Sequence, residues 1–108
     1  MPSPYYTAIL SGGTTSAPFT IDRPAPALAI LVPSWTASDL RIEYGATSGG
    51  NFGVLTRGDG SGVPWSAYSG AGPATAIVPV ATSFARLTSQ AAQADTRSFV
   101  ILTVRQYP

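Results

Sequence analysis

Short runs of apolar, β-branched and aromatic residues, separated by clusters of Gly, Pro, Ser and Asn, dominate this 108-residue sequence. Such runs are typical of strands, and their spacing is typical of a β-sandwich. Helix is poorly supported, because neither 81–86 nor 90–95 carries a full apolar stripe. We therefore predict an all-β fold, an antiparallel, jelly-roll-like β-sandwich. Its eight short strands are expected at residues 5–10, 19–21, 27–32, 40–44, 52–56, 75–80, 84–88 and 97–106.

One of these runs shows the alternation of a half-buried antiparallel strand. Apolar Leu40, Ile42 and Tyr44 fall on one side, while charged Arg41 and Glu43 fall on the other. Because successive side chains of a strand point to opposite faces, this pattern predicts one buried and one solvated face. The last run of the chain is apolar on both sides instead. A strand covered on both faces has this pattern, so we expect it at the centre of its sheet.

The length of the chain is that of one domain with one hydrophobic core. We predict a single β-sandwich over residues 13–108, preceded by an N-terminal arm or first strand over residues 1–12. No apolar run reaches the roughly 18 residues that a membrane helix needs. Residues 1–4 form neither a basic region nor an apolar signal core, so we expect a protein made without Sec export and without a membrane partner.

The sequence contains no Cys and no His. That excludes disulfides, the usual zinc sites, and catalysis by Ser-His-Asp triads or Cys-His dyads. Charged residues make up only 10% of the chain, against about 25% in an average soluble domain, and the net charge is +1. There is no basic stripe for a phosphate backbone, so we expect no nucleic-acid partner. We predict a protein that is not an enzyme and that uses no metal or cofactor.

Three carboxylates in the middle of the chain are the remaining candidates for catalysis or metal binding. Asp39 precedes its strand and Glu43 lies on the solvated face, which favours a surface role over a glycosidase pair. Asp59 lies in a glycine-rich loop, and one acid is too few for a calcium loop of the EF-hand type. We expect none of the three to be catalytic or to bind a metal.

Aromatic residues on a loop are the first candidate interaction site. Trp65 lies between Pro64 and Ser66 in a turn-rich segment with Tyr68 close by, and Tyr107 follows the last strand. Such side chains offer a glycan or a protein partner a large contact area. Alternatively, Trp65 and Tyr68 cap the core beneath a long loop. The sequence leaves both interpretations open.

Other candidate interaction residues lie near the strands. Adjacent Tyr5 and Tyr6 suit an arm that adds a strand to a neighbouring subunit. Arg86 and Arg97 are candidates for ion pairs between subunits, and surface solvation, worth under about 1 kcal/mol each, is the alternative. Low charge and many small residues predict a surface suited to close packing inside an assembly. A secreted or cell-wall β-domain would have a similar composition.

The middle and the end of the chain resemble a known family. Residues 32–45 read VPSWTASDLRIEYG, and residues 84–90 and 92–97, with the last apolar run, echo the second half of the same pattern. From residue 18 onward the chain resembles small β-sandwich proteins encoded among the structural genes of tailed bacteriophages and gene transfer agents. A glycine-rich turn, 49–51, stands where the family has an Asp-Gly turn.

The resemblance implies a non-enzymatic structural protein of a virion, assembled in the host cytoplasm. The first expectation is a capsid decoration, cement or head-fibre-base protein that binds the major capsid lattice on its surface. Because such proteins sit at symmetry axes, we expect a homo-oligomer, with a trimer favoured. The alternatives are a neck or tail component that contacts other virion proteins, or a carbohydrate-binding host-attachment module. Trp35 is expected in the core, packed against Leu40, Ile42, Phe52, Phe84, Leu87, Phe99 and Ile101.

Overall fold

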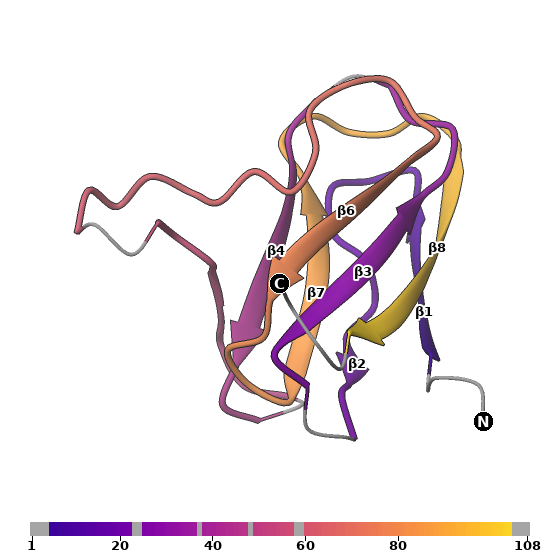
Figure 1. Cartoon of the computed structure of the whole chain (residues 1–108). Helices are drawn as coiled ribbons and strands as arrows, with labels where there is room; N and C mark the ends of the chain where they lie inside the picture. Colours follow the sequence, from indigo (N-terminus) through magenta and orange to yellow (C-terminus); the bar gives the residue numbers. More distant parts are fainter. Residues whose placement is uncertain (1–4, 23–24, 37, 48, 58–59, 105–108) are drawn as a thin grey trace.

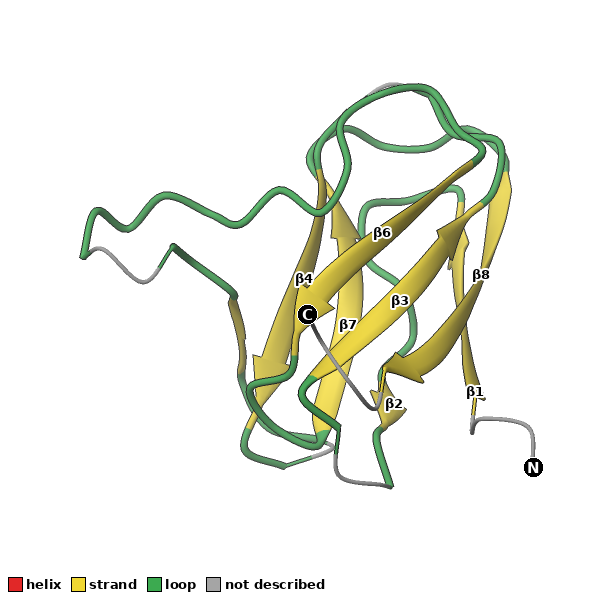
Figure 2. Ribbon diagram, in the orientation of Figure 1, coloured by secondary structure: helices red, strands yellow, loops and turns green. Residues whose placement is uncertain are grey.

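The computed structural model describes residues 5–22, 25–36, 38–47, 49–57 and 60–104. Among these residues there are eight strands and no helix. They form two four-stranded antiparallel sheets packed face to face (Figure 1). The predicted all-β sandwich is therefore confirmed (Figure 2). The strands are β1 (Tyr5–Ser11), β2 (Phe19–Thr20), β3 (Ala27–Val32), β4 (Leu40–Gly45), β5 (Phe52–Val54), β6 (Ala74–Pro79), β7 (Phe84–Ser89) and β8 (Thr96–Val104).

The strand order is that of a jelly roll. Sheet A has the order β1-β8-β3-β6, and sheet B has the order β2-β7-β4-β5. β4 pairs with β5, β3 with β6, β2 with β7 and β1 with β8, so the chain folds as a nested set of antiparallel pairs. Pairing of β8 with β3 and of β7 with β4 then rolls these pairs into two sheets. The central position predicted for the last strand is confirmed, since β8 lies between β1 and β3.

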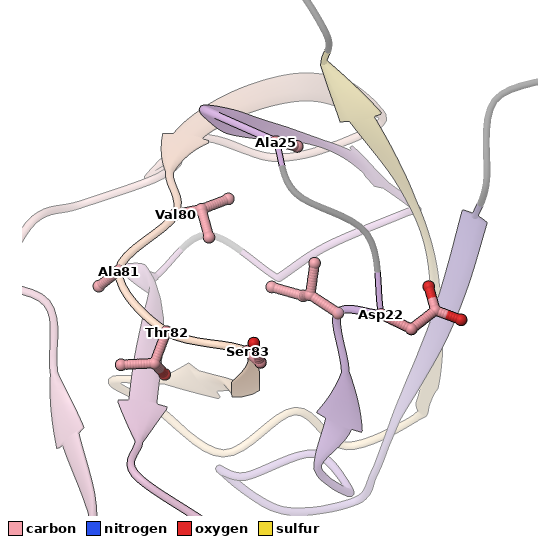
Figure 3. Close-up of a pocket in the computed structure, with 7 residues that line it drawn as sticks. Asp22, Ala25, Val80, Ala81, Thr82 and Ser83 are labelled. Carbon is pink, nitrogen blue, oxygen red and sulfur yellow. The ribbon is translucent and has the colours of Figure 1, made fainter.

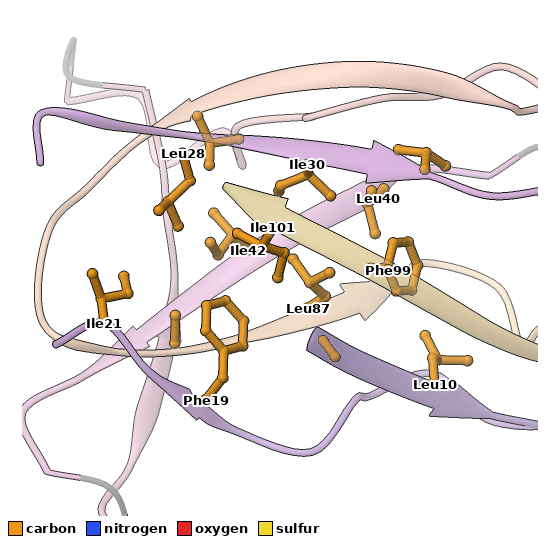
Figure 4. Close-up of a cluster of buried hydrophobic side chains, with 14 of the residues drawn as sticks. Leu10, Phe19, Ile21, Leu28, Ile30, Leu40, Ile42, Leu87, Phe99 and Ile101 are labelled. Carbon is orange, nitrogen blue, oxygen red and sulfur yellow. The ribbon is translucent and has the colours of Figure 1, made fainter. Parts of the chain in front are cut away.

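The core lies between the sheets and follows the period-2 pattern of the strands. In β4, Leu40, Ile42 and Tyr44 are buried while Arg41 and Glu43 are half-buried on the outer side, as predicted. Figure 4 shows side chains of both sheets meeting in one layer. The largest fully buried apolar side chains are Phe99, Leu10, Leu28, Ile30, Leu40, Ile42, Leu87, Ile101 and Val78.

Trp35 belongs to this core, as expected. It is 4% exposed, and its ring meets Phe99 edge to face at a centroid distance of 5.6 Å. Two of its predicted core partners were wrong: Phe52 and Phe84 are only half-buried and lie outside the core cluster. Both pair with Gly45, which lies in phase with the outward-facing residues of β4. Strand pairing thus directs both rings to the outer side of sheet B.

One end of the sandwich is closed by a buried polar network around Gln93. Its side chain is fully buried, and its Oε1 accepts hydrogen bonds from the Thr36 backbone N–H (3.0 Å) and from Arg97 Nε (3.2 Å). Gln93 Nε2 donates to the Thr36 carbonyl oxygen at 3.0 Å. Buried polar groups are retained when they are paired in this way. The network joins the loop after β3 to the connection between β7 and β8.

Candidate interaction surfaces

The outer face of sheet A exposes large apolar side chains. Of the six large hydrophobic residues that are exposed among those described, four lie on this face: Ile9 at 51% and Leu31, Ile77 and Val100 at 40% each. The register joins three of them across the sheet, because Val100 is opposite Leu31 and Leu102 is opposite Ala29, which faces Ile77, while Ile9 is opposite Ser98 at the β1 edge. Cross-strand neighbours of this kind form one surface.

Within the four strands that the structure describes, this face carries no ionic side chain. Arg97 is the one charged residue in the four strands of sheet A, and it is turned to the Gln93 network, where its Nη2 donates to Thr36 Oγ1 at 3.1 Å. With strands about 4.8 Å apart and about 3.3 Å per residue, the face spans roughly 400 Å². Exposed Thr7, Thr75 and Ser98 share this face, so its apolar part is smaller than the whole, at or below the low end of the roughly 300–600 Å² that the largest apolar patches on typical monomers reach.

Sequence reasoning missed this surface, although the signal was present in β8. The apolar character of both sides of β8 predicted cover on both faces. Phe99 and Ile101 are indeed fully buried, but Val100 remains exposed on the other side. The described part of the chain therefore leaves one of the two apolar faces of β8 uncovered.

The outer face of sheet B has the opposite chemistry. Arg86 Nε lies 2.6 Å from Glu43 Oε1, and the Arg86 guanidinium sits 4.7 Å from the centroid of the Phe52 ring. Arg41 Nη2 lies 3.2 Å from Asp39 Oδ2. Each of these charges thus has an oppositely charged partner within the chain. The face is thus a solvated surface of ion pairs, and the Arg86 contact expected between subunits is made inside one subunit.

A long excursion between β5 and β6 forms the second candidate surface, which we call the arm and which comprises the described residues 55–57 and 60–67. The base of the arm is fixed to β4: Leu55 N–H donates to the Ile42 carbonyl oxygen at 2.9 Å, and Ala67 N–H donates to that of Leu40 at 2.7 Å. Figure 1 shows the segment projecting away from the sandwich. Positive φ angles at Gly60 and Gly62 allow its return turn.

The two limbs of the arm pair with each other. Trp65 N–H donates to the Leu55 carbonyl oxygen at 2.7 Å, and Arg57 N–H donates to that of Val63 at 2.9 Å. Residues 63 and 65 therefore lie on one side of the limb, two positions apart. Val63 is 40% exposed and Trp65 is 37% exposed. They are the remaining two of the six exposed large hydrophobic residues, so the returning limb of the arm carries two exposed apolar side chains, with Trp65 next to the base.

Tyr68 does not share the exposure of Trp65. It is half-buried against the core, and its hydroxyl donates to the Ala71 carbonyl oxygen at 2.7 Å. The ring pairs recorded among the described residues are Tyr6 with Phe19 and Trp35 with Phe99. Trp65 and Tyr68 thus form no stacked platform, and Tyr107 lies outside the described residues.

The N-terminal candidates are part of sheet A. Tyr5 begins β1 and pairs with Leu102, and the whole of β1 pairs with β8. The Tyr6 hydroxyl donates to Asp22 Oδ1 at 2.7 Å, and its ring lies 6.0 Å from that of Phe19. The segment predicted as an arm or first strand therefore contains a strand of its own subunit.

A pocket lies where the connection from β2 to β3 faces the turn from β6 to β7 (Figure 3). Its volume is about 460 Å³. The Asp22 carboxylate lies at the rim, where it accepts the hydrogen bond from Tyr6. The walls mix apolar and small polar side chains, with no further charge among the described residues. The residues that form these walls are Ile21, Ala25, Val80, Ala81, Thr82 and Ser83.

The described residues assemble no group of three or more acids that suits a metal ion. Asp39 and Glu43, which were considered as a glycosidase pair and expected to be surface residues, are each engaged by an arginine on sheet B, and Asp59 lies outside the described residues. Burial raises the pKa of the Tyr44 phenol above its ordinary value. Its hydroxyl donates to the Pro79 carbonyl oxygen at 2.5 Å and so ties sheet B to sheet A.

A scan against protein-family models and searches of curated proteins and of solved structures found no match to this chain. Within the described residues, no helix has the length and apolar character to cross a membrane.

Proposed function

We propose that this chain is a non-enzymatic structural protein of a tailed-phage virion, bound to the major capsid lattice as a decoration, cement or head-fibre-base protein. The observation that carries the proposal is the uncharged apolar outer face of sheet A, with Ile9, Leu31, Ile77 and Val100 exposed. The sequence resemblance supports it. The jelly-roll architecture is common in viral capsid and lectin domains, which is support by analogy of fold.

The size of the face explains why such a protein acts in many copies. Its roughly 400 Å² is about half of the 800 Å² per partner that a standard stable interface buries. One copy alone therefore binds weakly. A capsid lattice repeats its binding site, and a homo-oligomer, for which a trimer is the first expectation, engages several sites at once and gains affinity from that multivalency.

The test is reconstitution on particles that lack this protein. Purified chain is added to them, and its copies are located by cryo-electron microscopy. We expect regular copies on the head surface, with sheet A facing the major capsid protein. Copies confined to the neck or tail would move the protein to the alternative virion position. Absence of binding to any part of the particle would contradict a virion role.

A carbohydrate-binding host-attachment module is the second candidate, favoured by the exposed Trp65 on the projecting arm. An exposed indole stacks well on a sugar ring. The engagement of Tyr68 with Ala71 removes the second aromatic residue expected at that site. Glycan-array binding that is lost in Trp65→Ala would support this function, and normal particle binding without any glycan binding would contradict it.

A further inference from the structure

We propose that two copies of this chain join through the open edge of β6, so that the four strands of sheet A in each copy form one continuous sheet. β6 is the outermost strand of sheet A, and β3 is its strand partner (Figure 1). Every residue of β6, Ala74–Pro79, belongs to the described part of the chain. The inference goes beyond the proposed function and does not rest on a virion role.

The register shows which backbone groups of β6 point away from β3. Val80 N–H donates to the Pro26 carbonyl oxygen at 3.1 Å, one position beyond the last pair of the β3–β6 ladder. Hydrogen-bonded and non-hydrogen-bonded pairs alternate along an antiparallel ladder, so positions 78, 76 and 74 bond to β3 while positions 75, 77 and 79 face outward. Thr75 and Ile77 therefore each present an N–H and a C=O at the edge of the sheet.

These outward groups have no partner within the described part of the chain. No backbone or side-chain hydrogen bond recorded there reaches the N–H or C=O of Thr75 or Ile77. The outward position of Pro79 is confirmed by its carbonyl oxygen, which accepts the hydrogen bond of the Tyr44 hydroxyl, and a proline has no N–H to leave unpaired there. The edge is thus a short row of backbone donors and acceptors, which an added extended strand satisfies.

β6 also lacks the features that protect an edge strand from pairing. It carries no charged side chain, and it pairs with β3 over its whole length without a bulge. Charges, bulges and very short strands are the usual means of preventing edge-to-edge contact. The other edges differ: β2 and β5 have two and three residues, and the β1 edge is partly closed, because Ala17 N–H donates to the Ile9 carbonyl oxygen at 3.4 Å.

A second β6 meets the requirements of this edge. In antiparallel pairing centred on Ala76, Thr75 of each copy is opposite Ile77 of the other, and every outward N–H and C=O of these residues is bonded. Centring the pairing on Thr75 or Ile77 instead brings in Pro73 or Pro79, and the missing N–H leaves carbonyl oxygens unpaired. The same groups meet on both sides, so the contact is isologous and closes with two copies.

The side chains fit the same arrangement. On the inner side of the sheet, Ala76 meets its own counterpart, and its small size avoids a clash there. On the outer side, the β-branched Thr75 and Ile77, both exposed, form two favourable cross-strand pairs. Neither β6 nor β3 carries a charge that would oppose the approach of a second copy. The outer face of sheet A stays open in this pair, and a trimer would need a different contact.

The small size of the contact determines the expected affinity. β6 spans about 20 Å, so the pair buries less than the roughly 800 Å² per partner of a standard stable interface. We therefore expect a weak dimer with a Kd of about 0.1 mM. Analytical ultracentrifugation of the wild-type chain between about 10 μM and 1 mM measures this Kd.

An introduced cysteine tests the register, because the chain has no cysteine of its own. Cα atoms of a non-hydrogen-bonded antiparallel pair lie about 4.5 Å apart, within the roughly 4.4–6.8 Å that a disulfide spans. Ala76→Cys is therefore expected to form a disulfide-linked dimer in a glutathione redox buffer. Ala74→Cys, the same change on the same side of β6, is the matched control: its two thiols lie about 13 Å apart along the strands and should remain unlinked.

A proline tests the backbone contact. Thr75→Pro removes an outward N–H but none of the bonds to β3, so we expect the Kd of the dimer to rise at least about tenfold. Thr7→Pro is the matched control on the opposite edge of sheet A, since Thr7 faces outward in phase with Ile9, and it should leave the Kd unchanged. Thermal melting verifies that the variants are folded, and the cysteine variants decide the question if Thr75→Pro does not fold.

Three results would overturn the inference: a wild-type chain that is monomeric up to about 1 mM, Ala76→Cys that forms disulfide dimers no faster than Ala74→Cys, or an unchanged Kd in folded Thr75→Pro. Particle binding is measured separately by co-sedimentation. A monomer that binds particles would contradict only the β6 contact, whereas a dimer that binds no particle would support the contact and contradict only the virion role.

Discussion

The two sheets of the sandwich are alike inside and different outside. Both inner faces are apolar and packed into one core, yet sheet A exposes Ile9, Leu31, Ile77 and Val100, while sheet B exposes ion pairs around Arg86 and Arg41. Folding requires only the inner faces to be apolar. An outer face that remains apolar and uncharged therefore points to a partner, whereas the face of sheet B already finds its partners within the chain.

The largest effect is expected when a charge is placed on the outer face of sheet A, and the quantity affected is the affinity for particles. Val100→Arg should lower the affinity for particles by about 100-fold, because the charge is buried without a partner when the face docks. The free energy of unfolding should change by less than about 1 kcal/mol, since Val100 faces solvent in the free chain.

Val54→Arg on sheet B is the matched control, because Val54 pairs with Glu43 on a face that already carries charge. Its affinity for particles, measured by co-sedimentation, should equal that of the wild-type chain. If Val100→Arg binds as well as Val54→Arg does, sheet A is not the docking face.

The buried Tyr44 hydroxyl, which joins sheet B to sheet A through its hydrogen bond to the Pro79 carbonyl oxygen, predicts that stability depends on pH in the alkaline range. Burial raises the pKa of Tyr44 in the folded chain, so above about pH 10, where an unfolded tyrosine ionises, the folded state holds more protons than the unfolded state. Stability is then lost as pH rises, with a slope of up to about 1.4 kcal/mol per pH unit. Below about pH 10 the stabilisation contributed by the protonated Tyr44 phenol is fully present.

Urea denaturation at several pH values between about 8 and 11 measures this slope. The Tyr44→Phe variant should be less stable at neutral pH, because the Pro79 carbonyl oxygen loses its donor, and should show a shallower slope above the pKa of free tyrosine. Equal slopes in the two proteins would show that other groups dominate the alkaline loss of stability.

The outer faces should also differ in what they contribute to folding. Arg86→Ala removes both the ion pair with Glu43 and the contact with Phe52, so we expect a loss of about 1–2 kcal/mol. Ile9→Thr on sheet A should change stability by less than about 0.5 kcal/mol. Chemical denaturation of both variants makes the comparison, and an equal loss in the two would remove the energetic distinction between the faces.

The smallest effect is expected at Arg41. Its Nη2 pairs with Asp39, but its Nε is buried without a hydrogen-bond partner among the described residues. The gain from the ion pair is therefore offset by the unpaired group. We expect Arg41→Gln to change the free energy of unfolding by less than about 0.5 kcal/mol. A loss above 1 kcal/mol in equilibrium denaturation would assign Arg41 a larger structural role.

Tryptophans illustrate the limit of sequence reasoning about sites. Trp35 was expected in the core and is 4% exposed, whereas Trp65 was left between core and surface and is 37% exposed. Both residues are tryptophans that closely follow a proline, so their local sequences do not distinguish a buried from an exposed position. Only the pairing of Leu55 with Trp65 and of Arg57 with Val63 reveals that residue 65 lies on a projecting limb.

Local pattern was enough to predict the strands from their apolar runs, the inward side of β4 from its alternation and the central position of β8 from its two apolar sides, because run length and side-chain period are properties of the strand itself. Tertiary structure alone decided the rest. Phe52 and Phe84 lie outside the core because both pair with Gly45, and Gln93 is buried because Thr36, 57 residues away, satisfies its amide. Pairing partners distant in sequence set burial, so the apolar face of sheet A, the arm and the pocket beside Asp22 form only once the jelly roll has closed.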